Sequence, residues 1–351
     1  MLQHATPASR LNSALRGGIV FSDLILLNHM LKKAFTKPWL SHDDQIQLLL
    51  QRGLKIPNRK KTQHLLEHIC YYRMSAYWYP LLTTEKEAHQ FKPNARFEDA
   101  FNLYCFDREL RKIVISELEK IEISFRSTIT NMISEKHNPF WYTDQSHFIN
   151  INTHKQSLRL FKKEIENTKE QSLVTFQSKY TNPFPPSWMT LEISSFGHLS
   201  RLYKNFKHRT IKKEISQQYN LPDTLFTSWM HSLSYLRNIC AHHARLWNRE
   251  ISITPAYPRK EIINWPVNPE IKNNTTFFLL SIIAFLLQTV HPKNSFAEKI
   301  TALIIRYPSV DLRPMGFPED WQKETLWKTS LLKRTHLRIN KRGHKIASRL
   351  R

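Results

Sequence analysis

The stretch Tyr235-Leu-Arg-Asn-Ile-Cys-Ala-His-His-Ala-Arg-Leu-Trp-Asn-Arg249 carries an arginine, an asparagine and two histidines between positions 237 and 243. Such a density of polar groups does not help a helix to bury a core face. The apolar residues in and before the stretch nevertheless recur every three, four or seven positions, which predicts one buried helix face. They are Leu225, Trp229, Leu233, Leu236, Cys240 and Trp247. We therefore expect one amphipathic helix from about Leu221 to about Arg249.

A second set of residues in the same stretch is polar and also steps by three or four. It consists of Ser234, Asn238, His242, Arg245 and Arg249. On a helix these residues share a face. Arg237 lies about 100° from Asn238 around the axis, so its long side chain can lean towards that face. His243 is expected on the apolar side, beside Ile239 and Leu246.

This polar face suits the cleavage of RNA through its own 2′-hydroxyl group. A histidine can move the proton at the 2′-oxygen or at the leaving oxygen. An arginine can hold the phosphate and offset the charge of the transition state, and an asparagine can orient either group. The candidate catalytic residues are Arg237, Asn238 and His242, and the candidate supporting residues are His243, Arg245 and Arg249.

Metal chemistry is not expected at this stretch. His242 and His243 are neighbours and diverge by about 100° on a helix. No histidine or carboxylate lies four residues from His242, so the usual helical pair of metal ligands is missing. We expect no metal ion and no cofactor.

The arginine, the asparagine and His242, with four residues between Arg237 and His242, resemble the catalytic signature of the HEPN superfamily of ribonucleases. The fuller string, from Arg237 to Arg249, resembles the Abi-like proteins of bacterial abortive infection, of the AbiD/AbiF type. The resemblance extends over about residues 35–329. It rests further on Gln45–Gly53, Tyr71-Tyr-Arg-Met-Ser-Ala-Tyr-Trp-Tyr79, Phe106–Arg111, Ile121–Arg126, Ser187-Trp-Met189, Ser195-Phe-Gly197 and Met315–Trp321.

The helical spacing favours an all-α fold, and the resemblance implies a HEPN-type helical bundle with additional helices. The basic C-terminal tail looks like an addition to the family pattern. The resemblance also implies a metal-independent endoribonuclease that acts as a toxin in phage defence. A structured noncoding RNA is the implied antitoxin, and because the chain shows one signature, a homodimer is implied. Two other interpretations stay open. The protein could bind a structured noncoding RNA without cutting it, or His242 could be a buried histidine satisfied inside the bundle.

The charge of the chain points to a polyanionic partner. Its 351 residues include 52 Lys and Arg against 29 Asp and Glu, a net charge of +23. Nucleic acid is favoured over a membrane, because no terminal helix combines a basic face with a wide apolar face. The candidate RNA contacts are Lys204, Lys207, Arg209, Lys212, Lys213, Lys333, Arg334, Arg338, Lys341 and Arg342. An ordinary solvated helix face is the alternative for residues 204–213.

Three cysteines and the lack of an apolar run near Met1 favour a cytoplasmic protein. We divide the chain into an N-terminal extension (1–34), an Abi-like helical domain (35–329) and a basic tail (330–351). Besides Leu221–Arg249, two helices are expected from their caps: one begins at Ser41 and Asp44 and ends at Gly53, and one begins at Ser187 and contains Gly197. The other expected helices are Ile19–Met30, Thr62–Tyr72 (continuing to Tyr79), Phe97–Ser134, His154–Gln171, Thr276–Val290, Ser295–Ile305 and Glu319–Trp327.

Two of these segments have an open interpretation. The aromatic run Tyr71–Tyr79 is a buried core cluster or a surface on which bases stack, and the core is favoured. Glu122 and Arg126 form a helical ion pair that either braces the candidate catalytic helix or lies on a partly solvated face. The solvated face is favoured.

Overall fold

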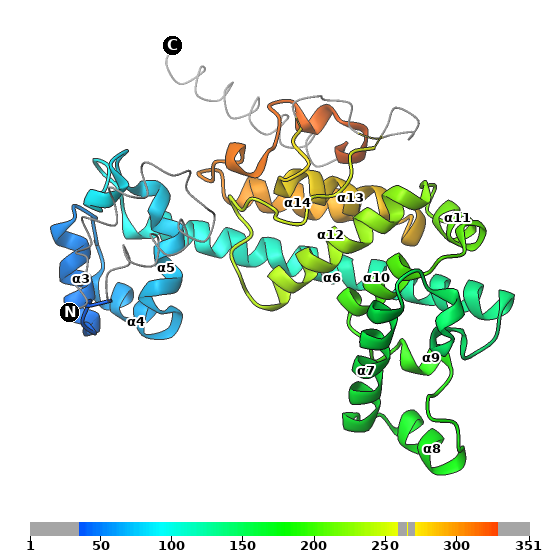
Figure 1. The fold of residues 1–351 in the computed structure, drawn as a ribbon. Coiled ribbons are helices and arrows are strands. Elements are labelled where there is room, and N and C mark those ends of the chain that lie inside the picture. The colour runs from blue at the N-terminus through cyan, green and yellow to red at the C-terminus, as the bar shows by residue number, and fades with distance from the viewer. Residues whose placement is uncertain (1–34, 259–264, 266–270, 329–351) are drawn as a thin grey trace, which may run out of the picture.

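The computed structural model describes residues 35–258, 265 and 271–328 (Figure 1). Within these ranges the regular elements are helices, and the only β-type pairs are isolated bridges. The predicted all-α class is confirmed. The predicted extension 1–34 with its helix Ile19–Met30, and the basic tail 330–351, lie outside the described residues. None of the described helices is long and apolar enough to cross a membrane.

The helix α6 (Phe97–Lys136) is the axis of the molecule. Its 40 residues span about 60 Å. Apolar residues at three- and four-residue spacing bury one side of it, as the sequence predicts. Figure 1 shows α6 crossing the view from the α3–α5 group to α11, with α13 and α14 above it. The helices α5, α9, α11, α12, α13 and α14 all pack on α6, so the core follows its length.

The N-terminal helices follow the predicted start but contain a break. The Oγ atom of Ser41 accepts the Asp44 N–H group (3.2 Å) and begins α3 (His42–Gln51), and Gly53 has a φ of +86° just after its end. One continuous helix from Thr62 to Tyr79 was predicted, and this is wrong. The chain forms α4 (Arg59–Ile69) and α5 (Tyr71–Trp78), because Cys70 lies between them with φ 73° and ψ 137°.

The middle of the chain forms shorter helices than expected. The predicted helix His154–Gln171 is α7 (Ile151–Asn167), and α8 (Gln171–Lys179) follows as a separate element. The single helix predicted after Ser187 is also wrong. Ser187 begins the one-turn α9 (Ser187–Thr190), and Ser195 caps α10 (Phe196–Asn205) by accepting the His198 N–H group at 3.3 Å.

Gly197 is therefore in the first turn of α10, not in the middle of a helix. A Cβ atom at this glycine would meet no described atom within 4 Å, so the predicted close packing at Gly197 is absent there. The next helix, α11 (Arg209–Gln217), leads into α12 (Asp223–Ala241), which crosses α6 and also packs on α10.

The C-terminal helices also pack on α6. The helix α13 (Thr276–Val290) is buried over nearly its whole length and α14 (Phe296–Arg306) follows it, both close to the predicted bounds. The predicted helix Glu319–Trp327 is instead a pair of 3₁₀ turns, η6 (Trp321–Lys323) and η7 (Thr325–Trp327). The other 3₁₀ turns are η1 (Tyr79–Leu81), η2 (Lys86–Ala88), η3 (Trp141–Thr143), η4 (Gln145–His147) and η5 (Arg313–Met315).

Candidate functional site

The helix α12 ends at Ala241 and does not continue to Arg249. The His242 N–H group still bonds to the Asn238 carbonyl (2.9 Å), the His243 N–H to Cys240 (3.1 Å) and the Ala244 N–H to Ile239 (3.0 Å). The last two bonds, with a φ of 55° at His243, form a Schellman motif. Histidine takes the left-handed position that glycine usually fills. The predicted single polar stripe is therefore wrong beyond Ala241.

A buried carboxylate explains why the chain leaves the helical path. Asp107 of α6 accepts the backbone N–H groups of Trp247 (2.6 Å) and Leu246 (3.1 Å). The Tyr77 hydroxyl donates to the same carboxylate at 2.6 Å, and Arg111 forms an ion pair with it. Burial raises the pKa of Asp107, while Arg111 and the hydrogen-bond donors act in the opposite direction.

The apolar residues of the predicted helix face are all buried, including those that follow the helix. Leu246 and Trp247 are almost fully buried, and the Trp247 indole N–H donates to the Asp311 carbonyl at 3.0 Å. Burial also raises the pKa of the Cys240 thiol to about 12, which suits an inert packing residue. The periodicity thus identified the buried residues correctly, but it wrongly predicted a helical backbone beyond Ala241.

Both histidines of the stretch are exposed. For His242, the interpretation as a histidine sealed inside the bundle is therefore wrong. His243 was predicted on the apolar side, and this is also wrong, since its backbone turns outward. The His243 carbonyl accepts a hydrogen bond from the Arg73 guanidinium group at 2.7 Å, which connects this turn to α5.

Arg237 lies one turn before the end of α12, where α6 holds its side chain. The guanidinium group donates to the Asn238 side-chain oxygen at 3.2 Å, and its Nε atom lies 3.5 Å from a Glu122 carboxylate oxygen. Glu122 also accepts from Arg126 at 2.7 Å. Glu122 and Arg126 are buried, so the interpretation favoured for them, a solvated face, is wrong. The Arg237 side chain remains 34% exposed.

The candidate supporting residues Arg245 and Arg249 make hydrogen bonds to backbone carbonyl groups of the protein itself. Arg245 donates to the Ala76 carbonyl at 3.0 Å and so binds the segment after α12 to α5. Arg249 donates to the Arg245 carbonyl at 3.3 Å. Ser234, at the start of the predicted stripe, is buried and bonds to the His231 carbonyl. These residues shape the segment that carries the two histidines.

Three adjoining hollows connect Arg237 to His242. The first, of about 910 Å³, is lined by Arg237, by Glu122 and other residues of α6, by Glu164 of α7 and by residues 192–195, which precede α10. The second, of about 520 Å³, shares Ile115 and Ala241 with the first. The third, of about 450 Å³, shares Arg73 and His243 with the second and contains His242. We call these hollows together the α12 track.

Charge is unevenly distributed along the α12 track. The hollow beside Arg237 includes the carboxylates of Glu119, Glu164 and Glu192. The other two hollows have no Asp or Glu among their lining residues, and they include Arg108, Lys112 and Arg73. The part of the track that runs from Ala241 to His242 therefore has a positively charged lining.

The aromatic run Tyr71–Tyr79 divides between core and surface. Tyr77 and Trp78 are buried, as favoured from the sequence. Tyr72 is 85% exposed and lines the same hollow as His242. Its ring is thus available to stack on a base beside the histidine.

The candidate RNA contacts outside α12 differ in their environment. Lys212 is buried, with its ammonium group 3.7 Å from the Asp223 carboxylate and 4.9 Å from the Tyr203 ring centre, so its assignment as an RNA contact is wrong. Burial also lowers the pKa of Lys212. The exposed residues are Lys204, Lys207, Arg209 and Lys213. Lys333, Arg334, Arg338, Lys341 and Arg342 lie outside the described residues.

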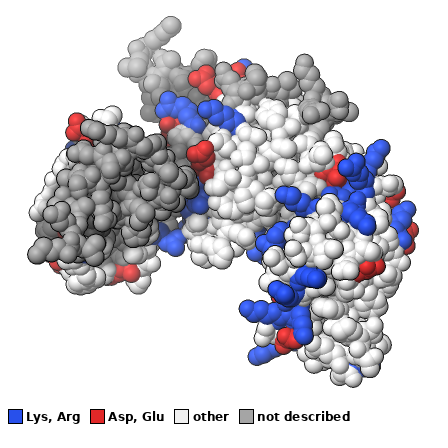
Figure 2. Space-filling view, viewed as in Figure 1, with Lys and Arg blue, Asp and Glu red and all other residues white. Residues whose placement is uncertain are grey.

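Lys and Arg side chains gather on the side of the molecule where Figure 1 places α7, α10 and α11 (Figure 2). The exposed candidates Lys204, Lys207, Arg209 and Lys213 belong to α10, α11 and the link between them. This surface is basic without Lys212, so the expected positive patch does not depend on that residue.

Sequence reasoning missed two features of the site. Asp107 occupies a position where the helical spacing of Leu103, Phe106 and Leu110 predicts burial, and a carboxylate at such a position was a usable signal. Cys70 and His243 both have positive φ angles and both line the hollow of His242. Nothing in the sequence around these two residues indicates that conformation.

A family model described as Abi-like protein matches residues 64–248. That segment is just over half of the chain and runs from α4 to the end of the segment that follows α12. It includes Asp107, Glu122, Arg237 and His242. No curated protein and no solved structure matches the chain.

Proposed function

The chain belongs to the Abi-like protein family, and on that premise we propose that it is a metal-independent endoribonuclease that acts as a toxin in abortive infection. The observation that supports this most is the exposed imidazole of His242 at the basic end of the α12 track, with Arg237 held by Glu122 farther along it. An accessible imidazole, which can accept and donate a proton, and a fixed cation are the parts that this chemistry requires.

In the proposed reaction, RNA lies along the α12 track with its scissile phosphate near the end of α12. His242 moves a proton, either from the 2′-hydroxyl group or to the leaving 5′-oxygen. Arg237 offsets the charge that develops on the phosphate. Asn238 positions Arg237 by accepting a hydrogen bond from its guanidinium group. Tyr72 supports a base by stacking.

Backbone strain supports the same location. Cys70 and His243 are non-glycine residues with φ angles of 73° and 55°, and both line the hollow of His242. Such residues cost about 1–3 kcal/mol each, and they cluster at functional sites. Arg73 connects the two positions, because it follows Cys70 in α5 and donates to the His243 carbonyl.

We propose that two copies of the chain form the active enzyme. Cleavage by the 2′-hydroxyl group needs both a base and an acid, and each chain offers one exposed His242. A second copy supplies the second imidazole if the ends of the two α12 helices face each other. Ile123, 51% exposed and lining the hollow beside Arg237, gives this face an apolar contact. A structured noncoding RNA is the antitoxin that we propose for the basic surface.

The test is a cleavage assay with the purified full chain. His242→Ala and Arg237→Ala should each lower the cleavage rate at least about a hundredfold, the usual scale for a lost acid–base group. Because His242 is exposed, its replacement should leave the unfolding transition within about 0.5 kcal/mol of the wild type. His291→Ala, at an exposed histidine after α13, is the matched control and should cleave normally. Full cleavage by His242→Ala would refute the assignment.

A non-enzymatic RNA-binding protein is the second candidate, and one observation favours it. Arg237 is paired with Glu122 and lies beside three further carboxylates, which weakens its attraction for a phosphate. Both functions predict binding that weakens steeply with salt. Prolonged incubation separates them, since RNA that stays intact with the dimeric protein would favour binding alone.

A further inference from the structure

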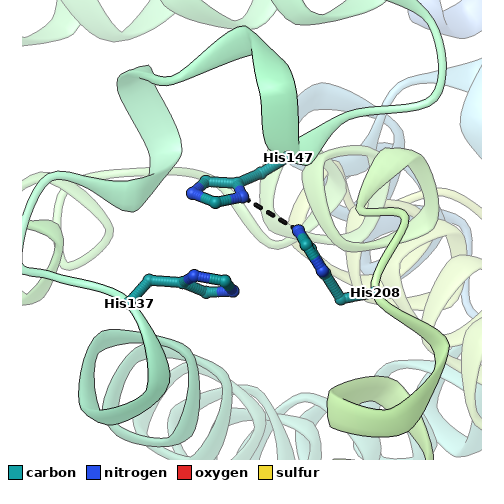
Figure 3. A group of neighbouring side chains, drawn as sticks. All are labelled: His137, His147 and His208. Atoms are coloured by element: carbon teal, nitrogen blue, oxygen red, sulfur yellow. Dashed lines mark hydrogen bonds between the residues drawn. The ribbon is translucent and has the colours of Figure 1, made fainter.

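Three histidines from distant parts of the chain meet at the far end of α6. His137 follows the last residue of α6, His147 ends η4, and His208 directly precedes α11 (Figure 3). One ring nitrogen of each lies within 4.8 Å of the others. The ring centroids are 4.1 Å apart for His137 and His147, and 4.7 Å for His137 and His208. The three rings therefore surround a common point.

The backbone holds two of these histidines in place. Phe148 and Phe206, which neighbour the site, pair in an antiparallel bridge. The Lys207 N–H group donates to the His147 carbonyl at 3.0 Å, and the Ile149 N–H donates to Asn205 at 2.9 Å. His147 and His208 are thus carried by two segments that are bonded to each other. A site of this kind is preorganised, since little chain entropy remains to be lost when a ligand binds.

The nitrogen atoms of the cluster cannot all satisfy one another. His147 Nδ1 and His208 Nε2 lie 2.9 Å apart, so one N–H group is shared between them. The Nε2 atom of His137 is buried and has no hydrogen-bond partner among the described residues. A buried polar atom without a partner is costly. A cation at the common point would satisfy all three nitrogens at once.

We propose that His137, His147 and His208 bind one zinc ion, or a similar divalent transition metal ion. Imidazole suits such ions. Zinc–nitrogen bonds are about 2.0–2.1 Å long, so binding would draw the three rings, whose nitrogens lie within 4.8 Å of one another, around the ion, and water completes the tetrahedron when three protein ligands are present. Asp144 lies where a carboxylate that orients a metal-bound histidine is expected. Its Oδ2 lies 3.8 Å from the Nε2 atom of His147, and it is the other ring nitrogen, Nδ1, that lies beside His208.

The proposed ion is structural. His137 follows the last residue of α6, about 45 Å along that helix from Asp107, which holds the segment after His242. The ion is thus too far from His242 of the same chain to join its chemistry. It would fix the end of α6 to η4 and to the start of α11. This departs from the expectation of no metal, which was argued only for the stretch around His242.

A second group, His64, Glu67 and His68, serves as the matched control. Its members are exposed and belong to one helix, α4, so no other element is held by them.

The experiment is a metal titration of the full chain after treatment with a chelator. The wild type should bind one Zn²⁺ per chain and unfold at a higher temperature with Zn²⁺ than without it. His137→Ala and His208→Ala should lower the affinity at least about a hundredfold and abolish the temperature shift, since even an outer-shell change costs 10–100-fold. The double variant His64→Ala/His68→Ala should bind Zn²⁺ as the wild type does.

An absorption spectrum of the wild-type protein tests the proposal even if the variants do not fold. Co²⁺ in the wild type should give the visible absorption of a four-coordinate ion, and added Zn²⁺ should remove it. The proposal is overturned if wild-type protein binds neither ion. It is also overturned if His137→Ala and His208→Ala bind Zn²⁺ normally, or if the His64/His68 variant loses the binding.

Discussion

The helix α6 carries two ion pairs near α12, and the two pairs make different contacts. Asp107 with Arg111, and Glu122 with Arg126, have the same four-residue spacing and the same order, about four turns apart. Asp107 accepts two backbone N–H groups of the segment after α12 and so fixes the path of the chain. Glu122 instead faces the side chain of Arg237. One pair therefore holds the segment that carries His242, and the other holds the side chain of Arg237 on α12.

Removing the charge of Asp107 should have the largest effect. Asp107→Asn leaves Arg111 buried without a counter-ion, and breaking a buried pair in this way costs about 3–5 kcal/mol. We expect that loss in urea unfolding, together with loss of cleavage, because the segment after α12 is displaced. Asp311→Asn is the control, since its pair with Arg313 is exposed to solvent and should contribute little to stability. Equal losses in the two variants would break the comparison.

Removing the charge of Glu122 should separate function from stability. Glu122→Gln weakens the hydrogen bond from Arg126, and a hydrogen bond to a charged group is worth about 1.5–3 kcal/mol. Arg126 keeps a second carboxylate, Glu192 at 3.8 Å, so the stability loss should be smaller than that of Asp107→Asn. Cleavage should fall at least about tenfold, because Arg237 is no longer held. The check is a measurement of rate and unfolding on the same samples. A variant that is destabilised yet cleaves at the wild-type rate would show that Glu122 has a structural role alone.

A glycine at position 243 should stabilise the segment that Asp107 anchors. His243 has a φ of 55° at the position where the Schellman motif favours glycine. His243→Gly should therefore raise the free energy of unfolding by about 1 kcal/mol. His243→Ala retains the Cβ atom and should give no gain. If both variants are destabilised, the imidazole of His243 makes a contact that the left-handed backbone does not explain.

The basic surface should show the smallest effects. Arg209→Ala and Lys213→Ala remove exposed cations, so each should weaken RNA binding severalfold and lower the salt slope by about 1. Lys212→Ala should instead lower stability, because Lys212 pairs with Asp223. The measurement is RNA affinity at a series of salt concentrations. Unchanged binding in both exposed variants would leave the α12 track as the binding surface.

The sequence predicted what local spacing determines. The three- and four-residue periodicity identified α6, α13 and the buried residues of α12, and the Ser41 cap marked the start of α3. The wrong predictions for residues 242–249 and for Glu122 and Arg126 share a cause, since each depends on a contact between residues that are distant in sequence. Asp107 ends the helical path after Ala241 across 139 positions of sequence. No periodicity in the stretch itself carries that information.

The same limit applies to charged and ligating side chains. The spacing of Glu122 and Arg126 is that of any exposed helical pair, but the fold buries both. Glu122 faces Arg237 of α12, and Arg126 donates to the Ser194 carbonyl. Lys212 belongs to a basic run and is buried by the same kind of distant contact, with Asp223. His137, His147 and His208 have no spacing that a metal motif would show, and the fold alone brings them together.

The central claim is that His242 promotes cleavage through the 2′-hydroxyl group of RNA without a metal ion. The most direct measurement incubates the wild type and His242→Ala with a short RNA in EDTA and identifies the product ends. The wild type should release fragments with a 2′,3′-cyclic or 3′-phosphate, and a 2′-deoxy nucleotide at the cut position should block cleavage. His242→Ala should give about 1% of that product or less. Cleavage that requires a divalent ion, or that persists in His242→Ala, would contradict the claim.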